Sequence, residues 1–134
     1  MCLAMEEAGL RTEDIGYFSL DGQAIPSSDV GEADALHRAF GVDLEEVPVS
    51  VPRTTTGHSY AAAGLLDTIT ALLALKNGLI PPTINCEELN PDFGLNLVRD
   101  EARPFSQPAV LLGGRGAGGA NVVIAIKRDV DSRL

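Results

Sequence analysis

The sequence predicts an α/β fold in which a mixed sheet packs on one strongly apolar helix, within a larger domain. Three observations lead to this prediction. Short apolar runs with strand character alternate with segments of helical period. Residues 57–76 are apolar on nearly every side of a helix, as expected for a helix enclosed by other elements. The last two strand candidates flank a glycine-rich segment, which is typical of a hairpin.

The first part of the chain predicts a helix end, a strand and a loop. Residues 1–10 have uneven helical spacing and no N-cap of their own, so we expect the end of a longer helix. A turn at residues 12–14 leads into a strand over residues 15–20, which ends at Asp21-Gly22. Residues 23–28 contain a proline and two serines and are expected to form a loop.

A second helix is expected to begin at Asp29. Asp29 and Glu32 have the spacing of a capping box, and Gly41 is placed to end the helix. Its apolar face is formed by Val30, Ala33, Leu36 and Phe40.

The remaining elements surround the strongly apolar helix. Residues 47–51 are the second strand candidate, and a loop follows it to Gly57. The helix spans Gly57 to Lys76 and ends at Asn77-Gly78. An extended segment at 81–82 and a polar loop at 87–94 follow, and the last strand candidates are residues 95–98, 109–112 and 122–126.

Composition excludes several classes of function. The 134 residues carry 10 basic and 19 acidic side chains, a net charge of −9, which disfavours binding to nucleic acid or to anionic membranes. Two cysteines and no Cys/His cluster predict neither a disulfide framework nor a metal site, and we expect no cofactor. We expect no signal peptide, because the first residues lack a basic region followed by a long apolar one. The longest apolar stretch is shorter than the roughly 18 to 20 residues of a membrane span. We expect a cytoplasmic protein.

Three polar or glycine-rich segments follow predicted strands, where the sites of α/β proteins usually lie. They are residues 20–23, 53–58 and 113–121. Each has an ordinary structural interpretation: Asp21-Gly22 as a plain turn, and His58 as a buried histidine at a helix start. The glycine segment leads into a strand rather than a helix, so it lacks the helix N-terminus that would bind a pyrophosphate.

Taken together, several motifs resemble the C-terminal half of a β-ketoacyl synthase, in order and with matching spacing. They are Asp29 with Glu32, Pro48-Val49-Ser50, Thr56-Gly57-His58, Ala61-Ala62-Ala63-Gly64, Gly78-Leu79-Ile80-Pro81-Pro82-Thr83-Ile84-Asn85 and Gly116-Ala117-Gly118-Gly119-Ala120-Asn121. The resemblance implies a thiolase-like fold, with residues 1–134 as the second of two similar halves. The first half, which carries the nucleophilic cysteine in active synthases, is expected to be absent. Neither Cys2 nor Cys86 stands at a position that the family uses.

The resemblance also implies roles for four residues near the strand ends. Active synthases have two catalytic histidines; His58 matches the second, whereas Asp21 replaces the first. Arg53 replaces the family's lysine, and Asp67 replaces its acidic partner. We expect Arg53 and Asp67 to form a buried ion pair.

The glycine segment differs from that of active synthases, which carry two aromatic gate residues there. Arg115 stands in place of an aromatic residue. The resemblance implies supporting roles for Asp67, Arg115, Ala117, Gly118, Gly119 and Asn121. This pattern, with Asp21-Gly22, is similar to the chain-length factor, the catalytically degenerate partner of the ketosynthase in type II polyketide synthases. We expect Arg115 to turn inward, pair with Asp21 and plug the pocket.

Three functions stay open at this point. The resemblance implies a non-catalytic subunit piece that pairs with a ketosynthase, or with the missing N-terminal half, and works on chains held by an acyl carrier protein. The alternative is a fragment of an active synthase that performs decarboxylative Claisen condensation, an acyltransferase reaction; the retained His58 favours it. The third is a structural or interaction domain that kept the fold without the chemistry.

Overall fold

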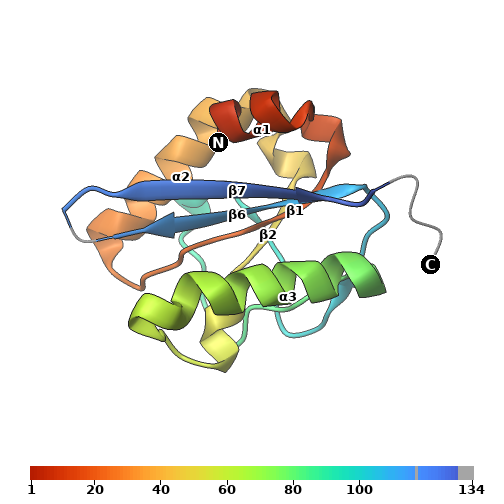
Figure 1. Cartoon of the computed structure of the whole chain (residues 1–134). Helices are drawn as coiled ribbons and strands as arrows, with labels where there is room; N and C mark the ends of the chain where they lie inside the picture. The colour runs from red at the N-terminus through yellow and green to blue at the C-terminus, as the bar shows by residue number, and fades with distance from the viewer. Residues whose placement is uncertain (117, 130–134) are drawn as a thin grey trace.

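The computed structural model describes residues 1–116 and 118–129, and its centre is a five-stranded mixed sheet (Figure 1). The strand order is β4-β2-β1-β6-β7; β4, β2, β1 and β6 are parallel, and β7 is antiparallel to β6. The strands are β1 (Ile15–Ser19), β2 (Pro48–Ser50), β4 (Asn96–Leu97), β6 (Ala109–Arg115) and β7 (Asn121–Lys127). A separate pair is formed by β3 (Leu79–Ile80) and β5 (Arg103–Pro104). The predicted mixed sheet and the terminal hairpin are confirmed.

Helices cover both faces of this sheet. Figure 1 shows α1 (Cys2–Ala8) and α2 (Pro26–Phe40) on one side, and α3 (Ala63–Asn77) on the other. Short 3-10 turns connect the elements: η1 (Thr12–Asp14), η2 (Gly41–Glu46), η3 (Pro52–Thr55), η4 (Tyr60–Ala62) and η5 (Pro91–Phe93). No helix among the described residues has both the length and the apolar character needed to cross a membrane.

Two apolar cores lie between the layers because β1 is buried on both faces. Phe18 packs with α2 residues such as Leu36 and Phe40 on one side. Tyr17 packs with the α3 residues Ala71 and Leu75 on the other. The carboxyl end of β1 is therefore fixed from both faces, and the segment that follows it has a firm support.

The second helix begins earlier than predicted, and the predicted capping box is wrong. Proline is favoured in the first turn of a helix, since its fixed φ fits and its missing N–H needs no partner, and α2 begins at Pro26. The side chain of Glu32 instead leaves the helix, accepting hydrogen bonds from the backbone N–H groups of Asp21 and Gly22. The predicted end at Gly41 is confirmed.

The strongly apolar helix begins later than predicted. Gly57 has a φ of 78° and Tyr60 a φ of 49°, both in the left-handed region that a helix cannot use, so α3 starts at Ala63. The residues buried on its inner face are three alanines, Leu75 and one acid, Asp67. Its outer face exposes Leu65, Leu66, Ile69, Leu72 and Leu73. Within the described residues the expected enclosure of this helix is therefore absent, because nothing covers its outer face.

Two consecutive basic residues at the end of β7 tie the layers together. Lys127 Nζ donates a hydrogen bond of 2.9 Å to the carbonyl of Ala8, at the end of α1. Arg128 donates to the carbonyl of Leu75, in the last turn of α3. Cations at helix C-termini also complement the helix dipole, so β7 holds one helix on each face.

Candidate functional site

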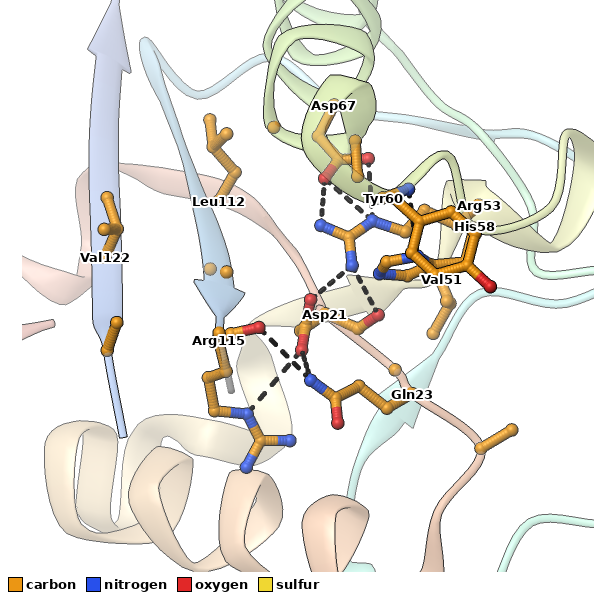
Figure 2. Close-up of a pocket in the computed structure, with 18 of the residues that line it drawn as sticks. Asp21, Gln23, Val51, Arg53, His58, Tyr60, Asp67, Leu112, Arg115 and Val122 are labelled. Atoms are coloured by element: carbon orange, nitrogen blue, oxygen red, sulfur yellow. Dashed lines mark hydrogen bonds and ion pairs between the residues drawn. The ribbon is translucent and has the colours of Figure 1, made fainter. Parts of the chain in front are cut away.

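The predicted site residues gather at a cavity of about 1030 Å³ beside the carboxyl ends of β1 and β6 (Figure 2). Its polar wall includes Asp21, Arg53, His58, Asp67 and Arg115. The rest of the lining is mainly apolar and includes Ile25, Val51, Leu112, Val122 and Ile124. As expected, three segments meet at this cavity. They are the segment after β1, the segment after β2 and the end of β6.

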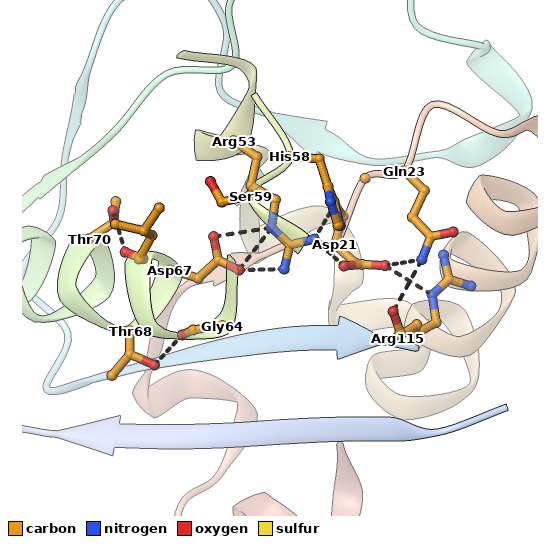
Figure 3. A network of polar contacts seen from close by, with 12 residues as sticks. Asp21, Gln23, Arg53, His58, Ser59, Gly64, Asp67, Thr68, Thr70 and Arg115 are labelled. Carbon is orange, nitrogen blue, oxygen red and sulfur yellow. Dashed lines mark hydrogen bonds and ion pairs between the residues drawn. The ribbon is translucent and has the colours of Figure 1, made fainter. Parts of the chain in front are cut away.

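Arg53 is the centre of the polar wall. Its Nε lies 2.9 Å from Oδ2 and 3.2 Å from Oδ1 of Asp67, and its Nη2 also donates to that carboxylate. Its Nη1 donates to the Asp21 carboxylate and to the Asp21 backbone carbonyl, the latter at 3.2 Å (Figure 3). The predicted pair of Arg53 and Asp67 is confirmed. The second carboxylate on the same guanidinium was not predicted.

All three of these charged groups are buried. The side chain of Asp21 is 1% exposed, and that of Arg53 is 9% exposed. Burial lowers the pKa of Arg53, but the hydrogen bonds that it donates to Asp67 and Asp21, and the charges of these carboxylates, outweigh burial and leave the pKa raised. Arg53 is therefore a fixed cation that cannot deliver a proton.

Arg115 turns inward from the end of β6, as predicted. Its Nε lies 3.8 Å from Asp21 Oδ2, and its Nη2 lies 3.6 Å from Glu32 Oε2. Both nitrogens are buried, and neither has a hydrogen-bond partner. The predicted pairing with Asp21 is confirmed, but the predicted plugging of the pocket is wrong for this chain: the pair forms part of the wall, and the cavity stays open beside it.

Glu32 completes the network from α2. Its Oε1 and Oε2 accept from the backbone N–H groups of Asp21 at 2.9 Å and Gly22 at 3.0 Å. Burial raises the pKa of Glu32, although these two hydrogen bonds and the charge of Arg115 act against it. The glutamate thereby fixes the backbone of the segment that presents Asp21.

Gln23 links three elements at the same place. Its Nε2 donates to Asp21 Oδ2 at 2.7 Å and to the Arg115 carbonyl at 3.3 Å, and its Oε1 accepts from Ser28 Oγ at 2.9 Å. Gln23 belongs to the segment 20–23 that was expected near the site, but no role was predicted for its side chain. Glu32 was expected to cap α2 and not to contribute to the site.

His58 lies on the cavity wall but outside this network. The sequence allowed a buried histidine at the helix start; the side chain is exposed, and α3 begins five residues later. The backbone N–H of Tyr60 donates to His58 Nδ1 at 3.1 Å, so the neutral imidazole carries its proton on Nε2. The Tyr60 ring meets the imidazole edge-on, with centroids 5.3 Å apart.

The supporting positions in the turn after β6 make contacts within the turn. Gly118 and Gly119 have φ angles of 84° and 87°, a conformation that favours glycine. Asn121 Nδ2 donates to the Gly119 carbonyl at 3.0 Å. Ala117 lies outside the described residues. Among the residues that the structure describes, no group of three or more His, Cys, Asp or Glu side chains is arranged to hold a metal ion.

Comparison with known proteins identifies the family. Residues 1–87 match the model of the β-ketoacyl synthase C-terminal domain, and the chain belongs to this family. It is 39% identical over 94% of its length to the actinorhodin polyketide putative β-ketoacyl synthase 2 of Streptomyces coelicolor, covering 30% of that protein. It is 36% identical over 94% of its length to the tetracenomycin polyketide synthase ketoacyl synthase beta subunit of Streptomyces glaucescens, again covering 30%.

The chain is also similar to a 3-oxoacyl-(acyl-carrier-protein) synthase and to a solved ketosynthase structure. The chain is 35% identical to the 3-oxoacyl-(acyl-carrier-protein) synthase 2 of Coxiella burnetii, over 96% of its own length and 31% of that protein. The ishigamide ketosynthase/chain length factor superposes with a TM-score of 0.88 at 30% identity, over 93% of this chain and 30% of that one. The thiolase-like ketosynthase fold is thus confirmed, and the chain spans about a third of the length of the curated relatives it matches.

Proposed function

We propose that this chain is the C-terminal half of a non-catalytic ketosynthase-like subunit, of the chain-length-factor type, which pairs with a ketosynthase in polyketide chain building. The observation that carries the proposal is the burial and the hydrogen bonding of the Asp21 carboxylate. Its buried carboxylate is fixed by Arg53 and Gln23 at the position where the family resemblance places a catalytic histidine.

The chemistry explains why this exchange removes activity. Decarboxylation of a malonyl thioester generates an enolate, which an active synthase stabilises through N–H donors at this place. An ionised Asp21 is an acceptor and repels the enolate. Loss of one oxyanion donor costs on the order of 100- to 1000-fold in rate, before the added negative charge is counted.

The uncovered face of α3 supports the proposal that residues 1–134 are one half of a domain. Five exposed leucine and isoleucine side chains line that face (Leu65, Leu66, Ile69, Leu72 and Leu73). An apolar helix surface of this kind is normally buried against another element. We assign it to the N-terminal half, and the length of the relatives leaves room for such a half.

The proposed partners follow from the names of the relatives. The similar structure is a ketosynthase/chain length factor, and one relative is named a 3-oxoacyl-(acyl-carrier-protein) synthase. We therefore assign a ketosynthase subunit and an acyl carrier protein as the partners of this protein.

One observation favours the alternative, an active β-ketoacyl synthase. His58 is retained, and the hydrogen bond from Tyr60 leaves its Nε2–H as a donor beside the cavity. One donor out of two remains, so the alternative predicts slow but measurable condensation.

Reconstitution with a ketosynthase tests the proposal. The protein, a ketosynthase, acyl carrier protein and malonyl units are combined, and each subunit is also tested alone. We expect a stable complex with the ketosynthase and polyketide product only when both subunits are present. Carbon–carbon bond formation by this protein without a ketosynthase would support the alternative instead.

A further inference from the structure

The extended segment at residues 81–84 contacts the turn that carries Arg53, the central residue of the polar wall. The first two residues of this segment are prolines, which have no backbone N–H, so its backbone donors are Thr83 and Ile84. Ile84 N–H donates to Thr54 Oγ1 at 3.0 Å. The segment therefore reaches the turn at the residue directly after Arg53.

The contact between the segment and the turn is reciprocal. Thr83 Oγ1 accepts a hydrogen bond of 2.8 Å from Val51 N–H, just as Thr54 Oγ1 accepts from Ile84 N–H. The Thr54 hydroxyl also donates to the Val51 carbonyl at 2.9 Å. We call the two hydroxyl groups, with these bonds, the threonine clamp. Because Val51 precedes Arg53 and Thr54 follows it, the clamp fixes the backbone on both sides of Arg53.

The clamp is anchored on the central sheet. Thr83 is buried, and its backbone N–H donates to the Val98 carbonyl at 2.9 Å. Val98 N–H in turn donates to the carbonyl of Val49, in β2, at 2.8 Å. The position of the Thr83 hydroxyl is thus set by main-chain bonds that do not involve the turn.

Arg53 has to meet two acids that come from different elements. Its Nε and Nη2 donate to Asp67, on α3, while its Nη1 donates to Asp21, which follows β1 (Figure 3). A guanidinium is planar, and its N–H groups point in fixed directions. It can therefore bond both acids only when the side chain starts from the right place. Attraction to the carboxylates alone does not fix that starting point.

We propose that Thr54 and Thr83 are positioning residues that hold the Arg53 guanidinium between Asp21 and Asp67. Without the clamp the turn shifts, and the bonds to the two acids are broken together more often. The positioning itself follows from the contacts of the turn. Only its consequence, a carboxylate kept fixed in the wall of an inactive site, rests on the proposed function.

Rotation of the Arg53 guanidinium about its Nε–Cζ bond tests the positioning. This rotation exchanges Nη1 with Nη2, so it must break the bonds to both acids, and ¹⁵N NMR line shapes report its rate. Thr54→Val and Thr83→Val should each speed it by roughly three- to tenfold, the range expected from loss of a hydrogen bond. Thr54→Ser and Thr83→Ser keep the hydroxyl and should rotate at close to the wild-type rate.

Thr70→Val is the matched control. It removes a hydroxyl whose bond to the Leu66 carbonyl, at 2.8 Å, stays within α3, so the rotation should not change. Exchange of the β1 and α3 backbone amides reports that each variant is folded. Should Thr83→Val fail to fold, Thr54→Val decides, because Thr54 is partly exposed.

Wild-type rotation in the folded valine variants would overturn the proposal. Equal acceleration in Thr70→Val or in the serine variants would overturn it too, since the effect would then not depend on the clamp hydroxyls. None of these measurements involves a ketosynthase or carbon–carbon bond formation. Failure of the positioning and failure of the proposed function are therefore distinguishable.

Discussion

Arg53 and Asp67 form a buried ion pair in which the guanidinium Nε lies 2.9 Å from the carboxylate Oδ2. Asp67 comes from the buried face of α3, and Arg53 from the turn after β2, so the pair joins the apolar helix to the strand ends. The same guanidinium also bonds Asp21, so one cation serves two buried acids. Because the two acids share one cation, substituting Arg53 and substituting Asp67 should change the free energy of unfolding by different amounts.

Removing Arg53 should therefore destabilise the protein more than removing Asp67. Arg53→Met leaves two buried carboxylates without their cation, whereas Asp67→Leu leaves Arg53 paired with Asp21. Breaking a buried pair costs about 3 to 5 kcal/mol, and removing both partners costs less than the sum. Urea unfolding of the two single variants and the double variant measures this. Additive losses, or equal losses for the two single variants, would contradict the shared cation.

The stability contribution of Glu32 should depend on pH with a defined sign. Because the pKa of Glu32 is raised in the folded protein, folding favours its protonated form. Its contribution is fully present below the pKa of the unfolded chain and is lost as the pH rises through the folded pKa. The free energy of unfolding of the wild type, relative to Glu32→Gln, should rise as the pH falls from 7 toward 4.5. Urea unfolding measures this difference between the wild type and Glu32→Gln. A difference that stays constant over this pH range would show that the Glu32 carboxyl has the same pKa in the folded and the unfolded chain.

Two glycine-to-alanine substitutions should have opposite effects. Gly31 lies within α2, and a Cβ there would sit 3.6 Å from Arg115 Nη1, an ordinary contact. Gly31→Ala should stabilise the protein by about 0.5 to 1 kcal/mol through the higher helix propensity of alanine. Gly16→Ala in β1 places its Cβ 2.1 Å from the Phe105 ring, which must shift, at a cost of about 1 to 3 kcal/mol. Thermal unfolding of both variants checks the signs; a destabilised Gly31→Ala would show that the guanidinium needs the space.

The sequence allowed the layers of the fold to be predicted better than the exact ends of its helices. The apolar pattern located β1, β6, β7, α2 and α3, because buried segments carry apolar residues in recognisable runs or periods; α1 was expected from a segment with uneven helical spacing. The start of α2 was missed because Pro26 acts through its own φ preference rather than through a side-chain cap. The start of α3 was missed because the left-handed backbone at Tyr60 leaves no mark in the apolar pattern.

The site was predictable where charge had to be balanced. Two pairs, Arg53 with Asp67 and Arg115 with Asp21, were expected because the family resemblance placed these residues near one another and a buried charge needs an opposite partner. Gln23 and Glu32 act through backbone groups and a neutral amide, and such contacts depend on three-dimensional placement. The open cavity was missed for the same reason, since only the three-dimensional structure shows that Arg115 lies in the wall of the cavity.

Release of CO2 from malonyl-acyl carrier protein tests the central claim most directly. The measurement compares the protein, its Asp21→His and His58→Ala variants, and a protein-free blank. Because Asp21 presents a carboxylate where an enolate would need a donor, we predict no release above the blank from the wild type. Asp21→His alone should not restore release, since Arg53 cannot transfer a proton. In addition, neither Cys2 nor Cys86 stands at the position of the family's nucleophilic cysteine. Release above the blank by the wild type, abolished in His58→Ala, would contradict the account.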